Sequence, residues 1–383
     1  MMALDRQIVS LLRAVARPCR DRSAGTIPEL AANITSWEGV VASAQQHGVL
    51  PMLYTRLAAS GALIPAGALE TMRRAFEGNA FFCLANAAEL LEVLKAFQEA
   101  EIAAMPFKGV VLGASAYGDV TARNAGDLDL LIFHRDLQRA TDILRNRGYA
   151  LATKVLKDGT PEAEHYFEYH FERHSDGMVL ELRWRLELTQ PRFRRVLGMD
   201  WVWPRRQTVT LAGVDVPSLD PVTALLVLCM HGSRHTWSRL MWVCDVAKLL
   251  ESEPSLDWAS AKREAKRVGL WRCLAVGVLL AQRVAGASVP ADVLESFAAD
   301  GAALRLAGFF ERCVLEDPGR LPDGPLPYNI QILGFRDRAS LVLSPTLLRP
   351  NARDRAVVKL PKYLDVLYYI VRPLRLLLDR SGR

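Results

Sequence analysis

The sequence lacks several features that mark specialised classes of protein. Its six cysteines show no CxxC spacing, which argues against a redox motif or a cysteine zinc site. It has no uninterrupted apolar run of the ~20 residues that a bilayer-spanning helix needs. The N-terminal stretch has no clean apolar core followed by a cleavage site, so a signal peptide is not expected. These absences favour a globular protein in a reducing cytoplasm.

The net charge of +6 gathers at one end of the chain. Residues 331–383, which we call the basic tail, contain eleven basic and four acidic residues. A basic surface attracts polyanions, so nucleic acid or an anionic membrane is a plausible neighbour, although a solvated arginine-rich face is an equal alternative. Arginines beside an apolar run also suit weak peripheral membrane contact by an interfacial helix.

The periodicity of apolar residues divides the chain into three parts. In residues 1–95, apolar side chains recur at spacings of three and four positions, which predicts an N-terminal helical region. Residues 96–200 alternate strand, helix and strand patterns and end in a hairpin, which predicts a core with a mixed sheet. Residues 201–383 return to helices and end in the basic tail. The expected class is α+β, with His47 as a hydrogen-bonding residue at a helix end.

The stretch RNAGDLDLLI places two carboxylates inside an apolar strand. Side chains alternate across a strand, so Asp127 and Asp129 share one face. Two adjacent like charges are unfavourable unless a cation neutralises them, and carboxylates suit Mg²⁺ or Mn²⁺. In VLELRWRLE, Glu181 is the best placed third acid and is preferred to Glu187. The alternative is that these acids are ordinary surface charges.

The order of motifs resembles the nucleotidyltransferase domain of the DNA polymerase β superfamily. More narrowly, KG…Y…RxxxDxDLL, a later strand with hydrophobic-Glu-x-x-Trp, and HxxxHxW…D resemble the bacterial family of uncharacterised nucleotidyltransferases. The resemblance extends from AQQHGVLP to VCDVAKLL. Two departures stand out: Lys108 precedes Gly109 in the first signature, and Arg183 stands where this family often has histidine.

The resemblance implies a role for each matching residue. Asp127 and Asp129 are expected to bind two divalent ions, and Glu181 the ion that activates the attacking group. Lys108 and Arg123 are expected to contact the phosphates of an NTP, with Gly109 allowing close backbone approach. His231 and His235 are expected to face the cleft and contact the nucleotide or acceptor, although a buried polar network that includes Asp245, or a zinc site, is also considered.

The resemblance therefore predicts a Mg²⁺- or Mn²⁺-dependent enzyme that transfers NMP from an NTP to a hydroxyl or phosphate and releases pyrophosphate. The acceptor is left open among RNA, a protein side chain, and a small molecule or peptide natural product. The competing hypothesis is a non-catalytic nucleotide-binding or scaffold protein that retains the fold. His165, His170 and His174 are interpreted as hairpin surface residues without a ligand-like partner.

Overall fold

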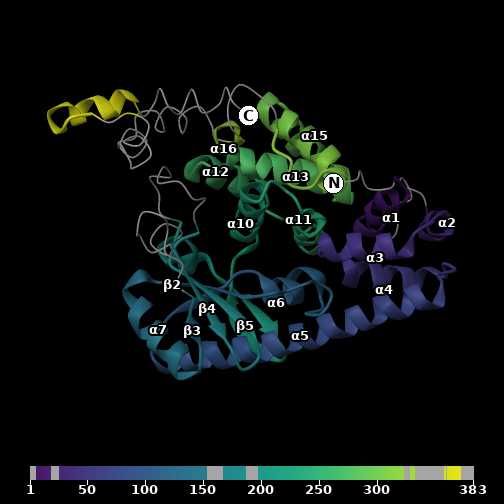
Figure 1. Cartoon of the computed structure of the whole chain (residues 1–383), viewed down its shortest axis with the longest axis horizontal. Helices are drawn as coiled ribbons and strands as arrows, with labels where there is room; N and C mark the ends of the chain where they lie inside the picture. Colours follow the sequence, from purple (N-terminus) through teal and green to yellow (C-terminus); the bar gives the residue numbers. More distant parts are fainter. Residues whose placement is uncertain are drawn as a thin grey trace.

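The chain folds into a mixed sheet flanked by helices from both ends of the sequence, which confirms the predicted α+β class (Figure 1). The last residues described, at the yellow end of the colour scale, form a short helical segment apart from the sheet (Figure 1). The structure, a computed structural model, describes residues 6–18, 26–152, 167–186, 197–322, 328–332, 358 and 360–371.

Five strands form the central sheet in the order β1-β2-β5-β4-β3. β2 runs parallel to β5, and the other neighbouring pairs are antiparallel. In β2, Leu128, Leu130 and Ile132 face one apolar cluster, whereas Leu131, and with it Asp129, faces the opposite side. The strands of this sheet are β1 (Ala104–Pro106), β2 (Leu128–Ile132), β3 (Ala150–Leu151), β4 (Glu168–Arg173) and β5 (Met178–Arg183).

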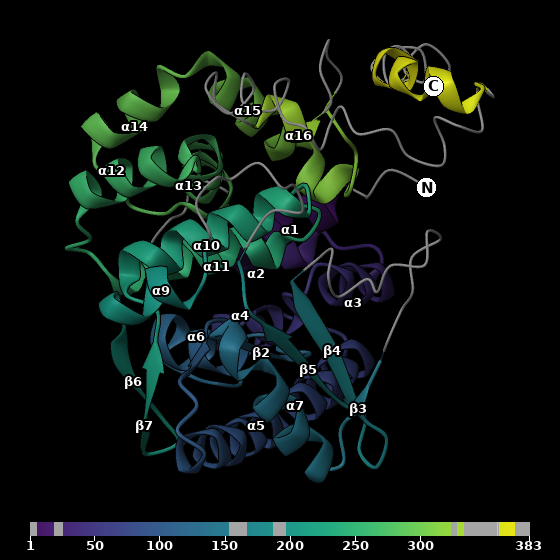
Figure 2. The same ribbon diagram turned by 90° about the vertical axis from the view of Figure 1, so that its left-hand side faces the viewer.

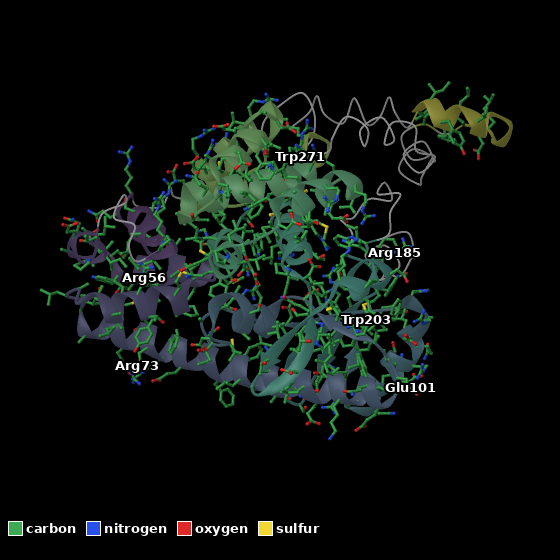
Figure 3. All side chains as sticks on the ribbon, turned by 180° about the vertical axis from the view of Figure 1, so that it is seen from behind. Arg56, Arg73, Glu101, Arg185, Trp203 and Trp271 are labelled. Atoms are coloured by element: carbon green, nitrogen blue, oxygen red, sulfur yellow. The ribbon has the colours of Figure 1, made fainter. Side chains whose placement is uncertain are left out.

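α5 (Ala66–Glu99) runs beneath the sheet and extends well past it (Figures 1 and 2). At 1.5 Å per residue it is about 50 Å long, and Arg73 and Glu101 near its ends lie on opposite sides of the molecule (Figure 3). The predicted boundary at residue 95 falls inside this helix, and the division into 1–95, 96–200 and 201–383 stays a prediction. α5 and α7 (Leu137–Asn146) cover the apolar face, where α5 contributes Cys83, Ala87, Leu90, Val93 and Phe97.

The N-terminal and C-terminal helices share a second core on the other side of the sheet. Leu12 and Leu53 from the first helices belong to the same buried cluster as Leu274 and Phe310 from the last ones. The C-terminal helices lie above the sheet, whereas the N-terminal helices lie to its side, next to the part of α5 that extends past it (Figure 1). The N-terminal helices are α1 (Arg6–Ala16), α2 (Ile27–Ala32), α3 (Trp37–Gln46) and α4 (Leu50–Ser60).

The C-terminal half begins with α9 (Met199–Val202) and a hairpin of β6 (Gln207–Leu211) and β7 (Val214–Ser218), and then becomes helical. α10 and α11 lie next to the sheet, and the later helices stack above them (Figure 2). These helices are α10 (Pro221–Arg234), α11 (Leu240–Ser252), α12 (Trp258–Val268), α13 (Trp271–Ala285), α14 (Ala291–Ala298), α15 (Gly301–Glu316) and α16 (Tyr328–Gln331).

His47 joins the end of α3 to the start of α11. Its Nδ1 accepts a hydrogen bond from the N–H of Leu240 at 3.3 Å, and its carbonyl accepts one from Met241 at 3.1 Å. Burial, with the charge of Arg239, lowers the pKa of His47 to about 4, so the ring is neutral at pH 7 and Nδ1 can accept. The prediction of a hydrogen-bonding histidine at a helix end is confirmed.

Each helix within the described ranges is too short or too polar to cross a bilayer. Most of the basic tail lies outside the described residues, so the predicted membrane contact stays a prediction. Glu187 and His165 also lie outside them.

Candidate active site

The turn after β1 brings a lysine and a glycine against the strand that carries the aspartates. Lys108 precedes α6 (Gly109–Leu112), which a π-helical turn over Gly113–Tyr117 continues. Gly109 has φ of +58°, a left-handed conformation that glycine adopts without strain. A Cβ there would lie 3.2 Å from the carbonyl oxygen of Asp127. Glycine therefore allows α6 to begin close to the acid-bearing segment.

Asp127, Asp129 and Glu181 converge on the face of the sheet that is turned toward α10. Asp129 lies opposite Glu181 in the parallel pairing of β2 with β5. One carboxylate oxygen from each of the three acids lies within 4.8 Å of the other two. The charge of Asp129, together with burial, raises the pKa of Asp127 to about 6. The structure thus brings together the three acids that the sequence singled out.

These carboxylates fit a hard divalent cation. Asp129 is buried, and its Oδ1 accepts no hydrogen bond from any residue that the structure describes. Lys108 Nζ lies 3.0 Å from that oxygen as an ion pair without hydrogen-bond geometry. Three converging oxygen donors, one with an unused lone pair, form the kind of ligand set that Mg²⁺ and Mn²⁺ prefer.

Three further residues of the hairpin belong to the same cluster. Arg183 contacts Glu181 and Glu168 through its two terminal nitrogens, and its Nε lies 3.8 Å from Asp129 Oδ1. His170 is exposed, as expected of a hairpin surface residue, but its Nδ1 lies 3.6 Å from Glu181 Oε1, so the expectation that it has no ligand-like partner is wrong. The sequence carries no clear signal for Glu168 or His170 as site residues, because their place depends on the register of β4 against β5. His174 is exposed, and its Nδ1 lies 4.0 Å from Glu172 Oε1.

Arg123 is held by a buried acid from the helical half. Its Nε and Nη2 donate to the two carboxylate oxygens of Asp245 at 2.8 and 3.0 Å, and Tyr117 Oη donates to Asp245 Oδ1 at 2.8 Å. Arg123 is 7% exposed and Asp245 1%. Paired in this way with Asp245 of α11, Arg123 lines the cleft and anchors the segment before β2.

α5 holds the same segment from below. Asn79, Cys83 and Asn86 lie one helical turn apart, and each donates a hydrogen bond to a backbone carbonyl of the segment. The acceptors are Thr121 at 2.9 Å, Arg123 at 3.3 Å and Ala125 at 3.0 Å. α5 therefore fixes the chain just before Asp127, although its sequence suggested no link to the chemistry.

α10 and α11 supply the opposite wall of the cleft. His231 and His235 lie with their ring centroids 4.7 Å apart, and Trp242 lies 5.4 and 5.1 Å from them. Burial, followed by the charge of Lys108, lowers the pKa of His231 well below its ordinary value. Burial, with the charge of Arg234, lowers the pKa of His235 to about 4. Both rings are neutral at pH 7, and within the described ranges neither belongs to a group of three metal-ligating residues.

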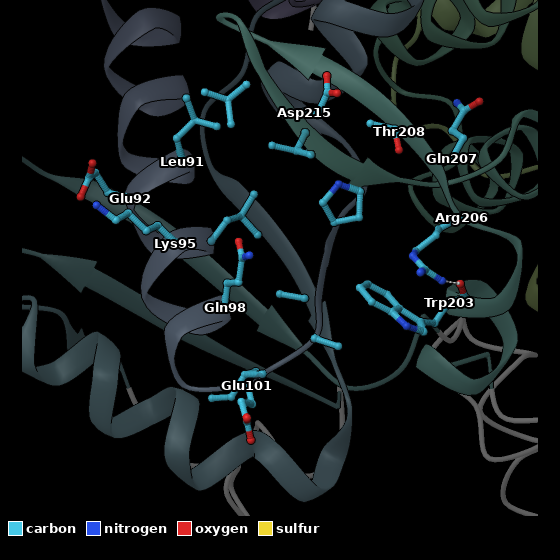
Figure 4. Close-up of a pocket in the computed structure, with 17 residues that line it drawn as sticks. Leu91, Glu92, Lys95, Gln98, Glu101, Trp203, Arg206, Gln207, Thr208 and Asp215 are labelled. Atoms are coloured by element: carbon cyan, nitrogen blue, oxygen red, sulfur yellow. Dashed lines mark hydrogen bonds between the residues drawn. The ribbon is translucent and has the colours of Figure 1, made fainter.

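The two walls enclose a cleft of about 560 Å³. All the predicted site residues except Gly109 line it, and so do Arg234, Arg239 and Trp242. A larger hollow of about 810 Å³ lies between α5, β1 and the β6–β7 hairpin, with Lys95 on one side of it and Trp203 and Arg206 on the other (Figure 4). Its charged residues are of both signs and do not converge. The smaller cleft is therefore the candidate active site.

Comparison with known proteins identifies a family. A family model described as "Uncharacterised nucleotidyltransferase" matches residues 33–286, about two thirds of the chain. The chain therefore belongs to this family, and its fold has the predicted nucleotidyltransferase core. No curated protein matches it. Among solved structures, the solution structure of the antibiotic-resistance factor ANT(2'')-Ia is similar with a TM-score of 0.30 and 14% identity, over 60% of this chain and 97% of that one.

Proposed function

We propose that this protein is a Mg²⁺- or Mn²⁺-dependent nucleotidyltransferase that moves NMP from an NTP to an acceptor and releases pyrophosphate. The observation that carries the proposal is the convergence of Asp127, Asp129 and Glu181 within 4.8 Å, in a cleft that basic and aromatic residues also line. Carboxylates alone would repel an NTP, whereas carboxylates that hold a divalent ion beside fixed cations attract its phosphates.

The reaction balances without any other reagent. An acceptor oxygen forms a bond to the α-phosphorus while the bond from that phosphorus to the α–β bridging oxygen breaks. Pyrophosphate takes the bonding electron pair, and a hydroxyl acceptor also releases its proton to water. A divalent ion held by Asp127, Asp129 and Glu181 supplies charge neutralisation at the reacting phosphate.

The chain itself contributes position and charge. Lys108 sits at the start of α6, beside Asp129, where its ammonium can bind a phosphate oxygen. Arg123, predicted to bind phosphate, donates both Nε and Nη2 to Asp245. These contacts favour a role in holding the segment before β2 in place.

The neutral rings of His231, His235 and Trp242 offer a surface for the base or the acceptor. An aromatic wall opposite the carboxylates suits stacking on a nucleobase, whose flat face every NTP presents. The acceptor class stays open among RNA, a protein side chain, and a small molecule or peptide natural product.

The test is incubation with each NTP labelled at the α-phosphate, with Mg²⁺ and either cellular RNA, protein extract or a small-molecule extract. We expect label to appear in one acceptor fraction, and to disappear from it with Asp127→Ala plus Asp129→Ala. Asp142→Ala plus Asp292→Ala is the matched control, because both side chains are more than half exposed and neither lines the cleft. If no NTP is consumed and calorimetry detects no Mg²⁺–NTP binding, the proposal fails and a scaffold role replaces it.

A further inference from the structure

Arg183 lies within the acid cluster and not at its edge. Its side chain is 10% exposed and contacts Glu168 and Glu181, with Asp129 Oδ1 at 3.8 Å from Nε. It comes from the last residue of β5, two positions after Glu181, so the strand places both side chains on one face. A guanidinium is always charged near neutral pH, so it brings a permanent positive charge to this place.

Lys108 is a second fixed cation in the same cluster. Its Nζ lies 3.0 Å from Asp129 Oδ1, and its side chain is only 9% exposed. Asp127, by contrast, has no ion pair within 4.0 Å among the described residues. Lys108 and Arg183 therefore lie next to Asp129 and Glu181. An added cation would be needed to neutralise Asp127.

The cluster already holds much of the positive charge that its acids need. Lys108 and Arg183 pair with Asp129, Glu168 and Glu181, and Arg234 and Arg239 also line the cleft. One further divalent ion is therefore enough, and a second would add charge to a cleft that is already basic. A second divalent ion bound to Glu181 would lie beside the guanidinium that already contacts it, and like charges at such distances repel strongly where water is scarce.

We propose that this site holds a single divalent cation per chain and that the Arg183 guanidinium takes the place of the second ion that the family resemblance implies. The inference rests on the proposed function and deepens it. Glu181 then binds two partners. One of its carboxylate oxygens contacts Arg183, and the other oxygen can bind the divalent ion. Arg183 positions Glu181 and supplies fixed charge, in the way that outer-shell partners orient the ligands of a metal.

The experiment counts bound ions directly. Mn²⁺ is titrated into the full-length protein and followed by electron paramagnetic resonance, with and without an α,β-methylene NTP analogue. We expect the wild-type protein to saturate at one Mn²⁺ per chain and Arg183→Gln to saturate at two. Arg183→Lys keeps the positive charge and should stay at one. Arg173→Gln, which alters another well-covered arginine of the hairpin with acidic partners, is the matched control and should also stay at one.

The outcomes separate this inference from the proposed function. Two Mn²⁺ ions on the nucleotide-loaded wild-type protein, or a count of one in folded Arg183→Gln, would overturn the single-ion site while leaving nucleotidyl transfer intact. Absence of both Mn²⁺ and nucleotide binding by the wild-type protein would overturn the proposed function itself. If circular dichroism shows that Arg183→Gln does not fold, the counts for the wild-type protein and Arg183→Lys decide, and a count of two for either one overturns the inference.

Discussion

The two faces of the central sheet differ in what they bury. On the face toward α5 and α7, the side chains of β2 and β5 are leucine, isoleucine and methionine, which pack into a hydrophobic cluster. On the face toward α10, the same two strands carry Asp129, Glu181 and Arg183. Alternation along a strand therefore lets one pair of neighbouring strands build a core and a polar site back to back.

The comparison shows how a buried polar site is kept in a stable fold. Most charges on the polar face have a partner from another element, as Arg123 has Asp245 and Lys108 has Asp129. Asp127 is the exception among the described residues, and the pKa of its carboxyl is raised. The apolar face supplies stability, and the polar face retains one uncompensated acid for which chemistry is the best explanation.

The largest expected effect comes from removing a carboxylate on the polar face. Asp129→Asn keeps the size of the side chain but removes a ligand charge, so we expect NMP transfer to fall by about a hundredfold to a thousandfold. The fall is measured as the rate of pyrophosphate release at saturating NTP. Asp136→Asn, which alters another buried aspartate of the core, is the control. Transfer within about threefold of the wild-type rate in Asp129→Asn would remove the polar face from the mechanism.

The next effect tests whether the polar face depends on its pairs for stability. Asp245→Ala leaves the buried Arg123 guanidinium without a counter-charge, which should lower the free energy of unfolding by about 3–5 kcal/mol. Urea denaturation measures this change. Glu251→Ala breaks the solvent-exposed pair with Lys248 and should lower it by less. Equal losses for the two variants would mean that burial of the first pair has no special weight.

A substitution on the apolar face should lower stability and leave the transfer rate unchanged. Leu130 is fully buried, so Leu130→Ala should lower the free energy of unfolding by about 3 kcal/mol through lost burial and a cavity. The transfer rate of the folded protein should stay within about twofold at a temperature where the variant is folded. Leu63→Ala, at a residue that is 93% exposed, is the stability control. A selective loss of transfer in Leu130→Ala would show that the two faces are not independent.

The smallest effect is a gain of stability. Because Asp129 and burial raise the pKa of Asp127 from 3.8 to about 6, the native state binds more protons there than the unfolded state, and stability falls as the pH rises through this window. Asp127→Asn removes this penalty, so the metal-free variant should be more stable than the wild-type protein by about 1–3 kcal/mol at pH 7 and no more stable at pH 3. Thermal unfolding at both pH values in a chelator measures it. A loss of stability at pH 7 would contradict the assignment of repulsion to this site.

The local patterns predicted much of this arrangement. The alternation in DLDLLI correctly placed Asp129 on the face opposite Leu128 and Leu130, and the choice of Glu181 agrees with its register opposite Asp129. Period-two alternation places Asp127 and Asp129 on one face, whereas the pairing of β2 with β5 that sets Glu181 opposite Asp129 is seen only in the structure.

The contacts that the sequence could not reveal are those between distant segments. Arg123 and Asp245 are separated by 122 positions, and nothing local in either segment signals their pairing. Asn79 and Asn86 look like ordinary polar residues of a helix, and only the packing of α5 under the 121–125 segment gives them a purpose. The place of Glu168 in the cluster depends on the register of β4 against β5, and the sequence alone does not determine that register.

The pairing of Arg123 with Asp245 has a consequence for how such a protein can be inherited. Arg123 lies just before β2 and Asp245 on α11, more than a hundred positions later, so a gene fragment that encodes residues 96–200 alone would carry this arginine without its acid partner. Recombination that exchanged this core between relatives would keep the pair only where the recipient's helix carries an aspartate at the matching position. The two segments that form the walls of the cleft are therefore expected to be inherited together.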